Sequence, residues 1–374
     1  MNSFGVYQAF YQSDKLSSSS PSSISWIGSI QVFIAMGLGI FVGPLYDRGF
    51  LRSLVAAGSS LIVLGMMMTS IGHFYYQIFL AQGICVGLGM GLTYVPILGE
   101  VSRHFTNRRP IALGISSTGA CVGGVLYPIL IRQLIPKVGF GWTVRVVAFV
   151  NLGCGIIAFA IVCRRQPNRA HSSRRALDLA AFRELPFSLF TLGMFLVFVP
   201  YYVPMTYIPV FAQTALRASD DLAGYMLAIV NAGSLLGRTV PYILNSRVTP
   251  IRIFFFWIIA GAILLFAWMA VTRISGFIVW CVFGGIVSGA LATAPIAAVS
   301  HPVLTPSPRE LGTRMGMSLL ASAIGDLVGP PIGGALVGVS EAHYARAQAV
   351  SGAIMTLGGF CLLWPLISIS KTTA

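Results

Sequence analysis

Eleven apolar stretches of about 20 residues, joined by short polar turns, constrain the fold of this chain more than any other feature. They cover residues 24–45, 53–72, 76–99, 111–135, 143–163, 187–213, 222–244, 252–272, 276–300, 315–338 and 349–369. A helix needs about 20 apolar residues to cross the hydrocarbon core of a bilayer. A helix also satisfies every backbone polar group within one segment, as the bilayer requires. The pattern therefore predicts an all-α polytopic membrane protein.

The composition excludes an ordinary soluble protein. Hydrophobic residues make up 56% of the chain and charged residues only 9%, whereas about a quarter of the residues in soluble domains are charged. A net charge of +14 would suggest a nucleic-acid partner in a soluble protein. Here the basic residues fall in short loops between spans, which is the positive-inside pattern, so no nucleic-acid partner is expected. The six cysteines lack metal-ligand spacing, and we expect neither a metal nor a cofactor.

The turn between the first two full spans carries an unusual group of charged and small residues. It reads GPLYDRGFLR and contains Gly43, Asp47, Arg48, Gly49 and Arg52. Glycines allow close helix approach and positive φ, and the aspartate and arginines can pair with one another and with helix ends. We expect this segment to be a gating turn; an ordinary positively charged membrane turn is the alternative.

This turn resembles the G-x-L-x-D-R-x-G-R signature between the second and third helices of the major facilitator superfamily of transporters. Four further stretches resemble the fungal branch of its monocarboxylate-transporter-like (monocarboxylate porter) family. They run from Val101 to Arg145, from Asn231 to Pro250, from Gly312 to Gly338 and from Tyr344 to Met355. The resemblance implies two six-helix bundles that move around a substrate site near the middle of the membrane.

The resemblance also suggests how the chain divides. SFGVYQAFY, from Ser3 to Tyr11, matches the motif that closes the first helix of the family. We therefore expect an N-terminal bundle over residues 1–163 with an incomplete first helix. A cytoplasmic linker is expected over 164–185 and a C-terminal bundle over 186–374.

The charged residues of the loops predict the orientation. Most of the 24 lysines and arginines fall on one side when the loops are assigned alternately, and the C-terminus lies on that side. The positive-inside rule makes that side cytoplasmic. We expect a multi-pass protein with a cytoplasmic C-terminus, at the plasma membrane rather than at a vacuolar or other internal membrane.

Arg238 is the leading candidate for substrate binding. It lies deep within an apolar span, and the resemblance aligns it with the arginine that binds a substrate carboxylate in the family. A guanidinium offers a planar fork for such a contact. Animal relatives carry an aspartate four residues earlier, where this chain has Ser234. The alternative is an arginine that extends to the membrane surface. Tyr7, an aromatic residue able to line a cavity, and Asn231, at the start of the same segment, are further substrate-binding candidates.

Asp326 lies near the middle of an apolar span, where ionisable groups are costly and are functional candidates by default. Three interpretations stay open. Its carboxyl group could take up and release a coupled proton, or form an ion pair with Arg238 or Arg145. It could also be a hydrogen-bonded polar residue between Gly325 and Gly329.

These features predict a secondary active or facilitative transporter of small organic anions, monocarboxylate-like or related metabolites, that works by alternating access. Two alternatives are an efflux transporter for a fungal secondary metabolite and a nutrient sensor or receptor on a transporter scaffold. An enzyme is not expected, because the five histidines are scattered and no HExxH, GxSxG or P-loop motif occurs. The expected partners are a small-molecule substrate, protons as candidate coupling ions, and the lipid bilayer.

Overall fold

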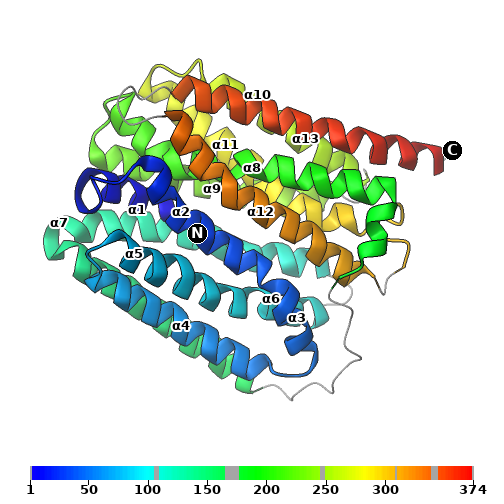
Figure 1. Ribbon diagram of the computed structural model, residues 1–374, viewed down its shortest axis with the longest axis horizontal. Coiled ribbons are helices and arrows are strands. Elements are labelled where there is room, and N and C mark those ends of the chain that lie inside the picture. The colour runs from blue at the N-terminus through cyan, green and yellow to red at the C-terminus, as the bar shows by residue number, and fades with distance from the viewer. Residues whose placement is uncertain are drawn as a thin grey trace.

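The computed structural model describes residues 2–104, 109–164, 177–244, 249–307, 310–337 and 344–372. Over these ranges the regular structure is entirely helical, which confirms the all-α expectation. The helices lie side by side and run roughly along the long axis of the molecule (Figure 1).

The N-terminal half of the chain, helices α1 to α7, builds one side of the molecule. Its elements are α1 (Phe4–Phe10), the π-helical turn η1 (Tyr11–Lys15), α2 (Pro21–Gly37), α3 (Gly39–Asp47), α4 (Leu51–Ile71), α5 (Tyr75–Ile78), the π-helical η2 (Phe79–Cys85), α6 (Val86–His104) and α7 (Arg109–Cys163). Helices α2 and α3 together form one span, and α5, η2 and most of α6 form another.

Helix α7 is 55 residues long but contains a sharp break. Gly139 has φ 75° and ψ 166°, a backbone conformation that glycine adopts at no steric cost because it has no Cβ. Pro136, three residues earlier, cannot donate the backbone hydrogen bond that would continue the helix. The break separates the two spans expected over 111–135 and 143–163.

The C-terminal half, helices α8 to α13, builds the other side. Its elements are the 3₁₀ turn η3 (Leu179–Arg183), α8 (Leu185–Thr214), α9 (Asp220–Leu244), α10 (Pro250–Trp268), α11 (Ile274–Val299), α12 (Leu311–Val337) and α13 (Tyr344–Thr372). Most residues of α8 are buried, although it contains Pro200, Pro204 and Pro209. Prolines are tolerated in membrane helices where neighbouring helices surround them.

Nine stretches of the described residues are long and apolar enough to cross a membrane. One of them, Ile115–Cys163, is 49 residues long and holds both spans of α7. Helix α9 occupies the expected span 222–244 but is not among the nine. The chain is therefore a multi-pass membrane protein. Most of the expected linker, over residues 165–176, lies outside the described residues.

The two halves are bonded to each other at one end of the molecule, here called the closed end. Helix α12 lies alongside α2 in Figure 1, and the Ser22 hydroxyl donates to the Pro331 carbonyl oxygen at 2.9 Å. The Ser25 hydroxyl of the N-terminal half bonds the Tyr207 hydroxyl of the C-terminal half, and Tyr207 also donates to the Pro330 carbonyl within its own half at 3.1 Å. A Cβ on Gly5 would lie 2.4 Å from the Met205 carbonyl oxygen, so α1 and α8 pack backbone to backbone here.

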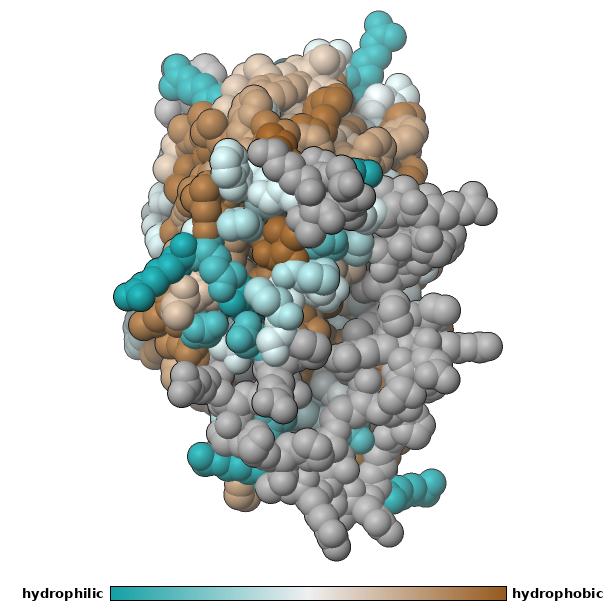
Figure 2. All heavy atoms as spheres, turned by 90° about the vertical axis from the view of Figure 1, so that its right-hand side faces the viewer, coloured by the Kyte–Doolittle hydropathy of each residue, from teal (hydrophilic) through white to brown (hydrophobic). Residues whose placement is uncertain are grey.

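At the opposite end, charged side chains pair within their own half. Arg52 donates to the Cys163 carbonyl at 2.9 Å in the N-terminal half, and Arg314 bonds Glu184 in the C-terminal half. Figure 2 shows this end, where hydrophilic side chains gather while hydrophobic ones cover the flanks. The two ends of the molecule are therefore built differently.

Candidate functional site

Arg238 lies on α9 between the two halves of the chain. It is buried, with 8% of its surface exposed, and its Nε has no hydrogen-bond partner. Tyr94 and Cys121 of the N-terminal half and Tyr201 and Tyr202 of the C-terminal half lie within its electrostatic range. Tyr94 is nevertheless 44% exposed, so the region next to Arg238 is not sealed. The structure thus places the positively charged Arg238 guanidinium inside the protein with an unused hydrogen-bond donor.

Asp326 lies on α12 and also faces the boundary between the halves. Its side chain is fully buried, and neither carboxylate oxygen has a hydrogen-bond partner. The ion pairs considered from the sequence, with Arg238 or Arg145, are therefore not formed. The Arg145 Nε donates instead to the Ser70 hydroxyl at 3.1 Å. The interpretation of Asp326 as a hydrogen-bonded residue is wrong for this conformation.

The two glycines beside Asp326 serve helix packing. A Cβ on Gly325 would lie 2.5 Å from the Phe195 carbonyl oxygen, and one on Gly329 still closer to the Val199 carbonyl. Close contact of this kind requires a glycine, because any side chain would displace the helix. The glycines press α12 against α8 and leave Asp326 at the contact with α2.

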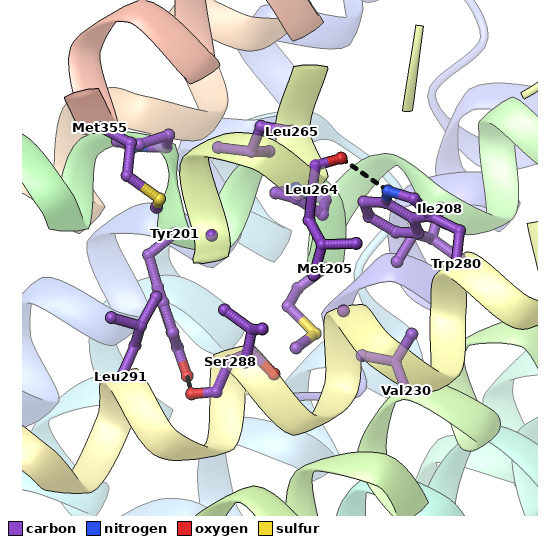
Figure 3. Close-up of a pocket in the computed structure, with 15 residues that line it drawn as sticks. Tyr201, Met205, Ile208, Val230, Leu264, Leu265, Trp280, Ser288, Leu291 and Met355 are labelled. Atoms are coloured by element: carbon purple, nitrogen blue, oxygen red, sulfur yellow. Dashed lines mark hydrogen bonds between the residues drawn. The ribbon is translucent and has the colours of Figure 1, made fainter. Parts of the chain in front are cut away.

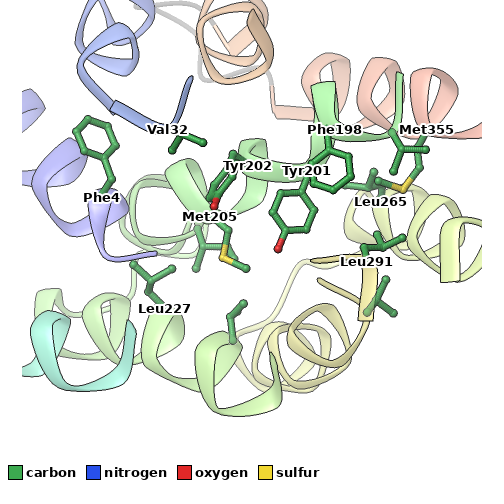
Figure 4. Packing of buried hydrophobic residues seen from close by; sticks show 14 of the residues in the cluster. Phe4, Val32, Phe198, Tyr201, Tyr202, Met205, Leu227, Leu265, Leu291 and Met355 are labelled. Carbon is green, nitrogen blue, oxygen red and sulfur yellow. The ribbon is translucent and has the colours of Figure 1, made fainter. Parts of the chain in front are cut away.

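A small cavity adjoins Asp326 and is lined from both halves. Phe4, Ser29 and Val32 come from α1 and α2; Tyr202, Met205 and Thr206 come from α8. Figure 4 shows Tyr202 and Met205 between Phe4 and Val32 on one side and the core of the C-terminal half on the other. Tyr201 and Tyr202 lie within electrostatic range of both Asp326 and Arg238, so the two ionisable residues share a neighbourhood on α8.

A second, apolar cavity lies within the C-terminal half, next to Tyr201 (Figure 3). The Tyr201 hydroxyl donates to the Ser288 carbonyl oxygen at 3.1 Å, and the Trp280 indole donates to the Leu264 carbonyl at 2.8 Å. Both bonds turn polar atoms away from the cavity, whose walls include Met205, Leu264, Leu265, Leu291 and Met355. Met205 lines both cavities, so the small cavity at Asp326 has apolar space beside it.

Of the other substrate-binding candidates, Asn231 lies in the contact between the halves, whereas Tyr7 packs against aromatic rings of its own half. Tyr7 packs against Tyr11 and Phe140, with ring centres 6.1 and 6.4 Å away. The Asn231 amide oxygen accepts from Asn2 at 3.0 Å, and its nitrogen donates to the Leu227 carbonyl at 2.9 Å. These bonds occupy Asn231 in this conformation. A role in substrate binding stays a prediction for both residues.

The expected gating turn connects α3 to α4. Gly49 has φ 93°, which explains the glycine at this position, whereas Gly43 has no heavy atom near its Cβ position. Asp47 ends α3 and Arg48 follows as its C-cap. Arg52 bonds the last turn of α7 through the Cys163 carbonyl. The turn is thus bonded to the distant end of its own half, and its gating role stays a prediction.

Sequence reasoning missed a charged cluster around Arg314. Its guanidinium is 3% exposed and donates two bonds of 2.6 Å to the carboxylate of Glu184 and one of 2.7 Å to the Leu304 carbonyl. Glu310 and Asp178 lie 3.3 and 3.9 Å from the same guanidinium. The cluster joins the segment before α8 to the start of α12. In the sequence, Arg314 reads only as one more basic residue near a loop.

The family is shown by comparison with known proteins. The Major Facilitator Superfamily matches residues 1–303. The MFS-type transporter dbaD of Emericella nidulans is 38% identical over 92% of this chain and 77% of its own length. The aspyridones efflux protein apdF of the same organism is 36% identical over 96% of this chain and 72% of its own. The chain belongs to the major facilitator superfamily.

A further relative and a solved structure are consistent with this family and fold. The agnestins efflux protein AgnL12 of Paecilomyces divaricatus is 33% identical over 98% of this chain and 83% of its own length. A crystal structure of the peptide transporter POT with alafosfalin superimposes with a TM-score of 0.75 at 14% identity, covering 96% of this chain and 89% of that one. The protein is a membrane transporter of this superfamily. The resemblance to the superfamily is confirmed, whereas two of these relatives are named for efflux and none for monocarboxylates.

The charged cluster makes stability depend on pH. The Arg314 guanidinium, hydrogen-bonded to Glu184, holds the pKa of that carboxyl below its ordinary value. A carboxyl with a lowered folded-state pKa stabilises the fold above its unfolded-state pKa of about 4.3 and loses this contribution as pH falls through the lower folded-state value. We predict that Glu184→Gln destabilises the protein by about 1 kcal/mol at pH 7, measured by thermal unfolding in detergent.

The control is Glu310→Gln, which removes a single longer contact to the same guanidinium and should have a smaller effect. The difference between wild type and Glu184→Gln should narrow as the pH is lowered from 7 below 4. A difference that stays constant over this range would contradict the assignment.

Proposed function

We propose that the protein exports an acidic fungal secondary metabolite, a small organic anion, by alternating access between its two halves. The observation that carries the proposal is that Arg238 and Asp326 both lie between the halves with bonding groups unused. A site at such a boundary can face each side of the membrane in turn. The sequence leaves the direction of transport open, and the efflux names of the relatives support export.

Arg238 is the proposed anion-binding residue. A guanidinium binds a carboxylate through two parallel hydrogen bonds, and Nε is one of the donors suited to that geometry. In the structure this Nε is unbonded, and the side chains within its electrostatic range are three tyrosines and a cysteine rather than a carboxylate. An anionic substrate would supply the missing partner.

Export requires an energy source, and we propose a proton that binds Asp326. A coupling proton needs a titratable group that reaches both sides alternately, and Asp326 faces a cavity between the halves. Inward movement of protons would then drive outward movement of the substrate. We further propose that residues 1–163 and 186–374 move as units joined by the 164–185 linker, with the turn at Asp47 as a latch. The C-terminus is proposed to be cytoplasmic and the site of action the plasma membrane.

The first test of this function concerns Arg238. Arg238→Lys keeps the charge but loses the planar fork, so export should fall about tenfold or more, the cost of losing hydrogen bonds to a charged group. Efflux of labelled aromatic and aliphatic carboxylic acids would be measured in a yeast strain that lacks its own exporters. Arg145→Lys, which alters an arginine bonded to Ser70 in the N-terminal half, is the matched control. Undiminished export by Arg238→Ala would refute the assignment.

The second test concerns the proton. Asp326→Asn keeps the shape of the side chain but cannot ionise, so it should still exchange substrate across vesicle membranes while losing any response to an imposed pH gradient. Substrate exchange and gradient-driven accumulation would be compared in the same vesicle preparation. If Asp326→Asn accumulates substrate against its gradient with the wild-type pH response, the coupling site lies elsewhere.

A further inference from the structure

The cavity beside Asp326 contains two unpartnered polar groups that come from opposite halves of the chain. Asp326 on α12 is fully buried with both carboxylate oxygens unbonded, and Ser29 on α2 is 2% exposed with its hydroxyl unbonded. Both line the same cavity. Buried polar groups in folded proteins nearly always have a partner, because an unbonded one costs several times the net value of a hydrogen bond. Two such groups on one cavity leave hydrogen-bonding capacity that a small polar group of a bound molecule can fill.

The remaining walls define what that ligand can be. Phe4, Val32, Met205 and Pro330 are apolar, while Tyr202 and Thr206 contribute neutral hydroxyl groups. Met205 also borders the apolar cavity of the C-terminal half. A second charged group would be poorly solvated against these walls. A hydroxyl group can donate to a carboxylate oxygen and at the same time accept from a serine hydroxyl. A single hydroxyl can therefore bond one Asp326 oxygen as a donor and the Ser29 hydroxyl as an acceptor.

We propose that this cavity binds a hydroxyl group of the transported molecule, so that the substrate class is the hydroxylated organic acids. The acidic group meets Arg238, the hydroxyl meets Asp326 and Ser29, and the apolar body lies against Tyr201, Tyr202 and Met205. This inference rests on the proposed function, because it assumes an anion site at Arg238. It adds a specificity-determining site that Arg238 alone does not provide. Since Ser29 and Asp326 belong to different halves, the hydroxyl also connects the two halves across the boundary.

The experiment compares pairs of acids that differ by one hydroxyl group. The probes are 4-hydroxybenzoate and benzoate, 3-(4-hydroxyphenyl)propanoate and 3-phenylpropanoate, and 12-hydroxydodecanoate and dodecanoate, which span a range of distances between the acid and the hydroxyl. Their affinities for the full-length protein in lipid nanodiscs would be measured by titration calorimetry. In at least one pair the hydroxylated acid should bind about tenfold tighter, the value of a buried hydrogen bond to a charged group.

Two variants and a control test whether the preference for the hydroxylated acid arises at Asp326 and Ser29. Asp326→Ala and Ser29→Ala should each reduce the preference for the hydroxylated acid to about twofold or less, while the affinity for its partner without the hydroxyl stays within about twofold of wild type. Thr191→Val is the matched control, because the Thr191 hydroxyl is also buried and unbonded. It lies on α8 about 15 Å along the helix from Tyr201. This variant should keep the wild-type preference.

The outcomes separate the inference from the function on which it rests. Equal affinities within every pair in wild type would overturn the hydroxyl site while leaving acid binding at Arg238 intact. A preference that survives in both Asp326→Ala and Ser29→Ala would also overturn it. If none of the six acids binds, the anion site is wrong, and the proposed function and this inference fail together.

Discussion

A polar or charged group in the interior of a membrane protein destabilises the structure unless it is bonded, and Arg238 and Asp326 are the two residues on which this constraint acts most strongly. Both lie between the halves of the chain with unbonded atoms, and Tyr201 and Tyr202 lie within electrostatic range of both. The surrounding architecture keeps them there. Gly325 and Gly329 allow α12 to pack closely against α8. The buried α8 lines both the small cavity at Asp326 and the apolar cavity of the C-terminal half.

The contacts between the halves are concentrated at the closed end and depend on backbone atoms. Ser22 donates to the Pro331 carbonyl, Ser25 bonds the Tyr207 hydroxyl, and Gly5 packs against the backbone of α8. Bonds of this kind are directional but few, so they can be broken together without disturbing either half. At the opposite end, the Arg52 bond to the Cys163 carbonyl lies within the N-terminal half and the charged cluster around Arg314 lies within the C-terminal half. This division suits two rigid units that move relative to each other.

Much of the fold could be predicted from the sequence, because apolar length alone determines where a chain can cross a bilayer. Arg238 and Asp326 could also be selected, since ionisable residues within apolar spans stand out. The surroundings of Asn231 could not, because they depend on which segment of the other half lies opposite, and Tyr7 packs against Phe140, 133 residues away in sequence. Arg314 was missed for a related reason: its carboxylate partner, Glu184, is 130 residues away in sequence. The efflux character of the relatives lies outside what residue chemistry alone can show.

The central claim, that the two halves open and close around a site at Arg238 and Asp326, is tested most directly by distances at both ends. Spin labels would be placed by Ser18→Cys and Ser219→Cys at the closed end and by Ser53→Cys and Ser300→Cys at the opposite end, all exposed positions, after replacement of the native cysteines. Pulsed electron spin resonance would record each pair in nanodiscs with and without an acid that the protein exports. The substrate should lengthen the closed-end distance in part of the population and shorten the opposite one in the same fraction. Distances that stay fixed at both ends, or that change in the same direction, would contradict the account.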